Sequence, residues 1–235
     1  SLGNAVTRIA EIFALMGLDN GVLRFVSRDT KNKKNVKNSI NSSLKMGLIS
    51  SLVSATALFL SAEWIVFKVL DEESFLITVI KVYAFSLPFC IPLLIASSST
   101  QAFKTMKYKI LVEHIVNPFT HVWAFIVSYI YFGDKLAVLV PPLLSPIIGL
   151  ILILIFLKKF IDLKFINFLK TPIDKKILMF SAPLMFVSVV GIMMHWVDIV
   201  MLGILSSAID VGMYHPIDRT AGLVRMILFA FAGIF

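Results

Sequence analysis

The chain has 235 residues, of which 58% are hydrophobic and 15% are charged, with a formal net charge of +8. Such a composition excludes an ordinary soluble domain, because so few charges cannot cover the surface of a water-soluble protein of this length. It also excludes an internal disulfide, since Cys90 is the sole cysteine in the sequence. The composition favours a helical protein that crosses a membrane several times.

Apolar runs long enough to cross a bilayer as helices recur along the sequence. In chain order, we predict membrane segments at about 1–23, 46–67, 75–103, 110–132, 136–157, 177–203 and 219–235. Prolines interrupt several of them, which is tolerated at membrane depth where protein or water satisfies the freed carbonyl. We therefore expect an all-α, polytopic transmembrane helical bundle whose helices bend around a polar cavity. The last run is short for a complete span, so we expect a piece of a longer protein.

Lysines and arginines cluster in alternate connections between these segments. The connections at 24–45, 104–109 and 158–176 hold most of the 22 basic residues. Cytoplasmic loops carry such an excess, so we predict that these connections are cytoplasmic and that the protein is a multi-pass protein of the cell (plasma) membrane. The positive charge predicts contact with anionic lipids on the cytoplasmic face and gives no reason to expect nucleic acid.

Two of these connections have patterns of their own. Residues 29–45 are rich in asparagine and lysine, which is typical of a solvated loop. Residues 158–170 mix aromatic, aliphatic and charged side chains, which favours a short helix in the membrane interface. Thr171, Pro172 and Asp174 then fit the N-cap, first position and first-turn acid of the next helix. The stretch 158–176 is therefore predicted to link two bundles.

Four charged residues fall within predicted membrane segments, toward the outer face of the bilayer. They are Arg8, Lys81, Asp198 and Arg225, each on a different segment. A charge that faced lipid there would cost kilocalories, so these side chains are expected to face water or one another. Alternatives stay open: Arg8 can pair with Glu11, Lys81 and Arg225 can extend to outer headgroups, and Asp198 can lie at the interface.

Further ionisable residues occur nearer the predicted cytoplasmic side. The stretch VEHIVNPFTH, residues 112–121, carries Glu113 and His121. Because the pKa values of glutamate and histidine respond to burial, these two residues, with Glu11 and His195, are candidates for ion or proton coupling. Hydrogen-bonded packing is the plainer alternative. Since no zinc-site spacing and no nucleotide-binding or catalytic motif occurs, we expect no metal, no cofactor, no catalytic residues and no enzyme activity.

Three stretches, in order, resemble one family. GLDNGVLRFVSR (17–28) resembles the segment that closes the second helix of polysaccharide repeat-unit flippases, and TQAFKTMKYKILVEHIVNP (100–118) resembles their turn between helices 4 and 5. Residues 180–224 are similar to the start of their second half, where a proline-bearing helix ends in Trp-x-Asp, followed by Leu-Gly and Val-Gly-x-Tyr. The similarity covers nearly the whole chain. It departs at Ile199, which is often basic in the family, and at Asp218, which is commonly tyrosine.

The resemblance implies a fold. These flippases belong to the multidrug/oligosaccharidyl-lipid/polysaccharide exporter superfamily, in which two six-helix lobes face a central cavity. The chain would hold helices 2 to 8 of that two-lobe exporter fold. Residues 1–157 would form the first transmembrane lobe (helices 2–6), 158–176 the cytoplasmic interfacial linker, and 177–235 the start of the second lobe (helices 7–8).

The resemblance also implies a function. The chain is expected to flip a polyprenyl-diphosphate-linked oligosaccharide from the inner to the outer leaflet for surface polysaccharide biosynthesis, by alternating access. Arg8, Lys81 and Arg225 would contact diphosphate or sugar acids, and Asp198 would position one of them. Partners would be this substrate, membrane lipids and, as an open option, other polysaccharide-assembly proteins. Alternatives are a multidrug/cation antiporter of the same superfamily, which prefers acidic cavity residues, and a membrane glycosyltransferase or polymerase, which short outer connections disfavour.

Overall fold

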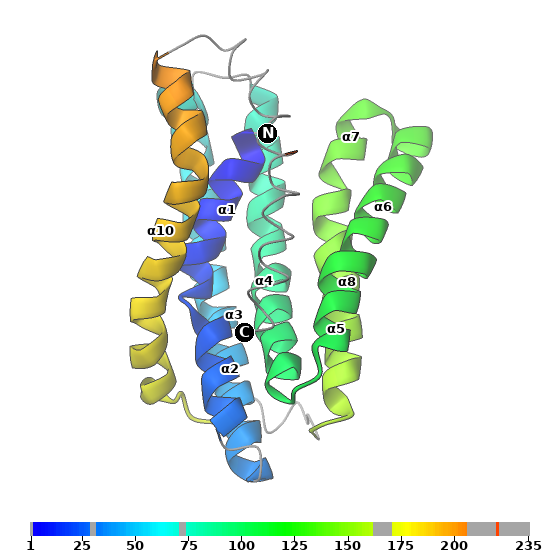
Figure 1. Ribbon diagram of the computed structural model, residues 1–235. Coiled ribbons are helices and arrows are strands. Elements are labelled where there is room, and N and C mark those ends of the chain that lie inside the picture. The colour runs from blue at the N-terminus through cyan, green and yellow to red at the C-terminus, as the bar shows by residue number, and fades with distance from the viewer. Residues whose placement is uncertain (1, 29–31, 71–73, 162–170, 206–219, 221–235) are drawn as a thin grey trace. The chain divides into compact units, whose positions relative to one another are not determined.

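The structure, a computed structural model, describes residues 2–28, 32–70, 74–161, 171–205 and 220 (Figure 1). The chain forms two compact units, Ser1–Phe186 and Val187–Phe235. Within the described ranges every regular element is a helix. The protein is therefore an all-α, polytopic helical bundle, as predicted, whereas the division into lobes at 157 and 177 stays a prediction.

The first predicted segment, 1–23, is not one helix. Helix α1 spans Leu2–Leu15 and α2 spans Leu18–Arg28. Between them Met16 and Gly17 have positive φ angles of 50° and 68°, which end α1 and redirect the chain. At Gly17 a Cβ atom would lie 2.5 Å from the carbonyl oxygen of Ser181, so this position needs glycine both for its φ and for the close approach.

The predicted solvated loop at 29–45 is also wrong, because helix α3 spans Lys33–Trp64 and continues into a π-helical stretch, η1, at Ile65–Leu70. Asn32 caps it by accepting a hydrogen bond from the backbone N–H of Asn35 at 3.3 Å. Val36, Ile40 and Leu44 lie four residues apart and are buried. That spacing indicates an amphipathic helix. The helix is difficult to recognise from composition, because asparagine and lysine are frequent among its other residues.

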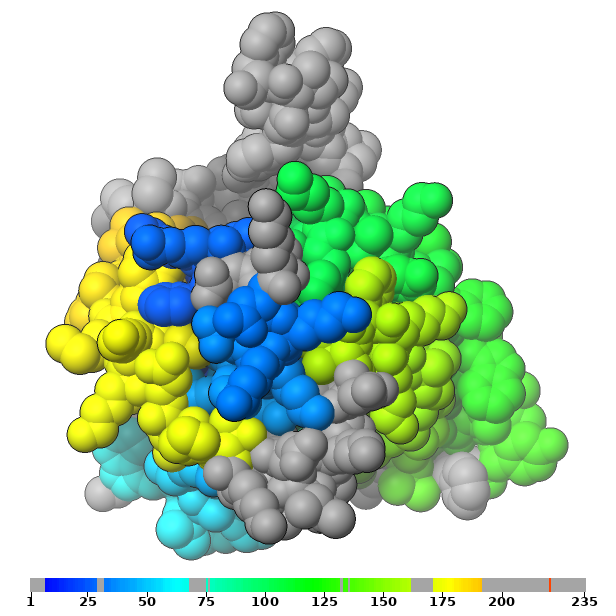
Figure 2. Space-filling view, turned by 90° about the horizontal axis from the view of Figure 1, so that it is seen from below, coloured from blue at the N-terminus to red at the C-terminus, as the bar shows by residue number. Residues whose placement is uncertain are grey.

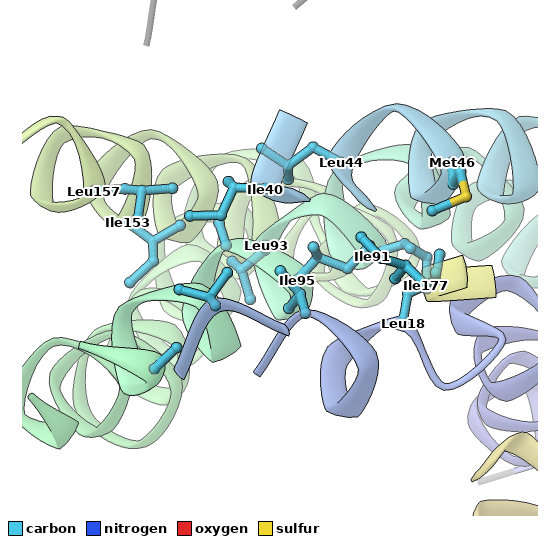
Figure 3. Close-up of a cluster of buried hydrophobic side chains, with 14 of the residues drawn as sticks. Leu18, Ile40, Leu44, Met46, Ile91, Leu93, Ile95, Ile153, Leu157 and Ile177 are labelled. Carbon is cyan, nitrogen blue, oxygen red and sulfur yellow. The ribbon is translucent and has the colours of Figure 1, made fainter. Parts of the chain in front are cut away.

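Helix α4, Ser74–Ala102, is the centre of the first unit and contacts α1, α2, α3 and α8. Its residues Ile91, Leu93 and Ile95 are buried in one apolar cluster with residues of α2, α3, α8 and α10 (Figure 3). Since lipid is as apolar as these side chains, close van der Waals packing holds the helices together.

The remaining helical elements are α5 (Met106–Ile110), η2 (Leu111–Val116), α6 (Asn117–Phe132), α7 (Asp134–Leu139), α8 (Pro141–Lys158) and α10 (Lys175–Leu205).

Four helical runs in the described residues are long and apolar enough to cross a membrane: Lys33–Phe67, Ile77–Ala102, Met106–Tyr131 and Leu136–Lys158. They confirm the membrane segments predicted at 46–67, 75–103, 110–132 and 136–157. Large apolar side chains such as Leu60 and Ile130 are exposed on them, as lipid-facing residues are. Helix α10 covers the predicted segment 177–203, and the segment 219–235 lies outside the described residues except for Thr220.

The described parts of the basic connections lie at one end of the first unit. The end of α2, the start of α3, the end of α8 and the start of α10 meet there, as Figures 1 and 2 show. The turn after α4 lies at the same end (Figure 1). This grouping of the lysine- and arginine-rich stretches is what a membrane protein with one basic face requires. That the basic face is cytoplasmic stays a prediction.

Hydrogen bonds join the chain before α10 to α3. The Nζ atom of Lys45 donates to the carbonyl oxygen of Thr171 at 3.3 Å, and the backbone N–H of Asp174 donates to Ser42 Oγ at 2.7 Å. Asp174 in turn accepts from the N–H of Lys176 at 3.0 Å. Asp174 is therefore the N-cap, and the predicted cap at Thr171 is wrong because α3 holds that residue instead. Most of the predicted interfacial helix, 162–170, lies outside the described residues.

The first turns of α10 pack closely on α2. Phe180 meets Phe25 edge-on, with ring centroids 6.0 Å apart, and the guanidinium of Arg24 lies 4.3 Å from the centroid of the Phe180 ring. Gly21 and Ser181 face each other so closely that a Cβ at Gly21 would lie 2.0 Å from Ser181 Oγ. Small residues thus permit this helix contact, as in other membrane bundles.

Gly17→Ala should lower the free energy of unfolding by about 1–3 kcal/mol, because the new Cβ meets backbone atoms of α10 and L residues are strained at this φ. Thermal unfolding of the full-length protein in detergent checks this. Gly191→Ala is the matched control, since a Cβ there has open space. Equal unfolding temperatures for both variants would contradict the described contact between Gly17 and α10.

Candidate functional site

A polar pocket of about 330 Å³ lies among α1, α4, η2, α6 and α8 of the first unit. Its wall combines ionisable groups, hydroxyls and proline rings, and apart from α1 it belongs to helical runs long and apolar enough to cross a membrane. The lining residues are Thr7, Arg8, Glu11, Tyr83, Ser86, Leu87, Cys90, Glu113, Asn117, Pro118, His121, Pro142, Ser145 and Pro146. A polar space at this position fits the expectation of a polar cavity bounded by proline-bearing helices.

Local irregularity of the helices shapes the wall. In η2 the N–H of Asn117 bonds to the carbonyl of Val112, five residues back, and Pro118 follows immediately. A π-helical turn and a proline both remove regular backbone bonds, and such turns are frequent at functional sites. The hydroxyl of Ser145 on α8 donates to the Asn117 carbonyl at 3.0 Å. One side chain of α8 thus supports the irregular turn of η2 and α6.

Arg8 and Glu11 form an ion pair at the pocket, with 2.9 Å between Arg8 Nη1 and Glu11 Oε2. Arg8 is 59% exposed whereas Glu11 is 11% exposed. The local pair, which the sequence left as an alternative for Arg8, is therefore present. It compensates the buried carboxylate, which would otherwise be costly at membrane depth.

The pocket also holds a carboxylate without such compensation. One oxygen of Glu113, Oε1, is buried and has no hydrogen-bond partner. His121 lines the same pocket and is exposed. The lining contains two glutamates and one arginine. The pocket therefore carries one more acidic than basic group when His121 is neutral. The structure brings Glu11, Glu113 and His121 together, and their role in ion or proton coupling stays a prediction.

Lys81 lies elsewhere. Its Nζ is 2.9 Å from Oε1 of Glu63 on α3, a side chain that is 67% exposed. It also lies 5.2 Å from the ring centroid of the exposed Phe59. The expected convergence of Lys81 with Arg8 is therefore not found, because an acidic partner on the neighbouring helix holds Lys81 outside the pocket.

The remaining predicted site residues are in α10 or in the chain that follows it. His195 and Asp198 are in the helical part of α10, but their side chains are outside the described ones, as is the whole of Arg225. Their roles stay predictions. In the part of the chain that the structure describes, no cluster of histidine, cysteine, aspartate and glutamate is arranged to hold a metal ion.

Several lining residues were not recognised from the sequence as parts of a site. Tyr83 and Ser86 on α4 and Ser145 on α8 all line the pocket. The available signal was a small polar residue next to a proline within an apolar run, as in Ser145-Pro146. Such pairs occur where a membrane helix bends around a polar space.

Arg8→Met should lower the free energy of unfolding by about 1–2 kcal/mol, because the buried Glu11 carboxylate loses its cation while Arg8 itself is largely exposed. The double variant Arg8→Met/Glu11→Gln should recover much of that loss, since no uncompensated charge then remains. Thermal unfolding in detergent of the four forms measures this coupling. Strictly additive effects of the two substitutions would show that the ion pair contributes nothing.

Comparison with known proteins places the whole chain in one family. The model of the polysaccharide biosynthesis protein family matches residues 1–235. No curated protein and no solved structure gives a match. The family agrees with the membrane-spanning helices and with the resemblance seen in the sequence. The chain belongs to the polysaccharide biosynthesis protein family.

Proposed function

We propose that the protein is a transporter, not an enzyme, that flips a polyprenyl-diphosphate-linked oligosaccharide from the inner to the outer leaflet for surface polysaccharide biosynthesis. One observation carries the proposal: a member of the polysaccharide biosynthesis family has a polar pocket beside three helical runs that are long and apolar enough to cross a membrane. A polysaccharide precursor made on a lipid in the cytoplasm must cross the membrane before it is used outside. The pocket gives its polar head a place within the bilayer.

The physical need for such a pocket is clear. Sugars carry many hydroxyl groups, and each one moved into hydrocarbon without a partner costs several kilocalories. Fixed polar groups within the protein replace the lost water, as Arg8, Glu11 and Glu113 can do here. The polyprenyl tail needs no such site, because it remains soluble in the bilayer.

Alternating access is the proposed mechanism. In this proposal, residues 1–157 form a first lobe, and a second lobe that begins at 177 moves against it. Two hydrogen bonds join the chain before α10 to Ser42 and Lys45 of α3, which supports a boundary at this point. The basic end of the unit would face the cytoplasm, where anionic lipids and the newly made substrate occur.

A second candidate is a multidrug/cation antiporter. The excess of one acidic group in the pocket favours it, because a cation is attracted to an uncompensated carboxylate such as Glu113. The family match favours the flippase. The two functions differ in what accumulates when the protein is lost: the lipid-linked oligosaccharide for a flippase, and a cationic solute for an antiporter.

Depletion of the full-length protein should trap the lipid-linked oligosaccharide in the inner leaflet. Right-side-out vesicles from depleted cells are treated with a membrane-impermeant sugar oxidant, and the fraction of protected lipid-linked oligosaccharide is measured by mass spectrometry. It should rise severalfold and return to normal when the protein is restored. An unchanged protected fraction, or accumulation of a cationic solute instead, would reject flipping.

Arg8→Ala should reduce surface polysaccharide at least tenfold while membrane insertion remains normal, because Arg8 holds Glu11 at the pocket. Lys81→Ala is the matched control: it removes a cation of a similar depth that pairs with Glu63 outside the pocket, and export should stay within about twofold of wild type. Immunoblots of surface polysaccharide and of the membrane-inserted protein provide the readouts. Equal export by the two variants would remove the reason to place the substrate at this pocket.

A further inference from the structure

We infer that the pocket in the first unit binds a sugar of the substrate head group and does not bind its diphosphate. The inference rests on the proposed function and assigns one part of the proposed substrate to one place. It changes the expectation from the sequence, in which Arg8 was to contact diphosphate or sugar acids. Charge, hydrogen-bonding capacity and size of the pocket each support it.

The charge of the pocket disfavours a diphosphate. Arg8 already pairs with Glu11 at 2.9 Å, so its charge is largely compensated. Glu113 adds a second carboxylate to the same lining. A diphosphate carries negative charges of its own, and these would be repelled by the nearby carboxylates. A sugar without charge meets no such repulsion.

The hydrogen-bonding groups of the pocket also favour a sugar over a diphosphate. The Ser86 hydroxyl donates to the carbonyl of Tyr83 at 2.7 Å, and the Ser145 hydroxyl donates to the carbonyl of Asn117 at 3.0 Å. A serine has one hydrogen to donate, so both hydroxyls can offer a ligand only their acceptor lone pairs. The buried Oε1 of Glu113 is likewise an acceptor that has no partner. Beside the donors of Arg8, Tyr83 and Asn117, the pocket thus offers several acceptors, to which sugar hydroxyls can donate and ionised phosphate oxygens cannot.

The size and the remaining wall suit one sugar ring. A volume of about 330 Å³ is ample for one sugar ring, because its bonded heavy atoms occupy less space than the same number of separate water molecules. Leu87, Pro118 and Pro146 provide apolar surface beside the polar groups. Sugar rings combine hydroxyl edges with C–H faces, so such a mixed wall matches their surface.

Cys90 provides a native reporter, because its side chain lines the pocket. Full-length protein in detergent is treated with methyl methanethiosulfonate, and modification of the Cys90 peptide is followed by mass spectrometry. The reaction is run alone, with inorganic pyrophosphate, or with the glycan released by mild acid from the lipid-linked oligosaccharide of the same cells. The glycan should slow modification at least threefold, whereas pyrophosphate should leave the rate unchanged.

Glu113→Gln should weaken protection by the glycan about tenfold, since a hydrogen bond to a charged acceptor is replaced by one to a neutral amide. Glu63→Gln is the matched control, because that carboxylate lies outside the pocket and pairs with Lys81. A thermal-shift series with the same two probes and the same variants repeats the comparison without relying on the thiol.

Protection by pyrophosphate equal to or greater than protection by the glycan would overturn the inference, as would the absence of glycan protection in both measurements. Unchanged protection in Glu113→Gln would remove that residue from the sugar site. The vesicle experiment separates this inference from the proposed function. If depletion traps the lipid-linked oligosaccharide but the glycan does not protect Cys90, the proposed flipping activity is supported and only the proposed sugar site is rejected.

Discussion

The ion pair between Arg8 and Glu11 is the interaction on which the candidate site depends. A carboxylate that is only 11% exposed among apolar helices requires a nearby cation, and Arg8 provides it at 2.9 Å. The pair places two charged groups of α1 in the wall that it shares with α4, η2, α6 and α8.

The same rule of polar satisfaction explains how the bundle is built around the pocket. Prolines and a π-helical turn interrupt the regular backbone hydrogen bonds in η2, α6 and α8, and hydroxyls such as that of Ser145 donate to backbone carbonyls of these helices. Having donated their hydrogens to the backbone, these hydroxyls offer only acceptor capacity to a ligand. The irregular helices thus affect both the shape of the pocket and the hydrogen-bonding groups that it presents.

Much of the fold could be predicted from the sequence, because apolar length and the position of basic residues follow directly from the bilayer. The break at Met16 and Gly17 was missed because the apolar run continues through it, although a glycine of positive φ is a local signal for the end of a helix. The helix over 33–45 was missed because its buried residues are spaced four apart among many asparagines and lysines. For the site, depth in the membrane identified Arg8, but depth alone could not distinguish it from Lys81, whose partner Glu63 comes from another helix.

A structure of the full-length protein bound to its lipid-linked oligosaccharide tests the central claim most directly. The account predicts a sugar ring among α1, α4, α6 and α8, with hydroxyls within hydrogen-bond distance of Glu113 and with the pair of Arg8 and Glu11 intact. A diphosphate in that position, or a pocket filled by an acyl chain while the sugars lie elsewhere, would contradict it.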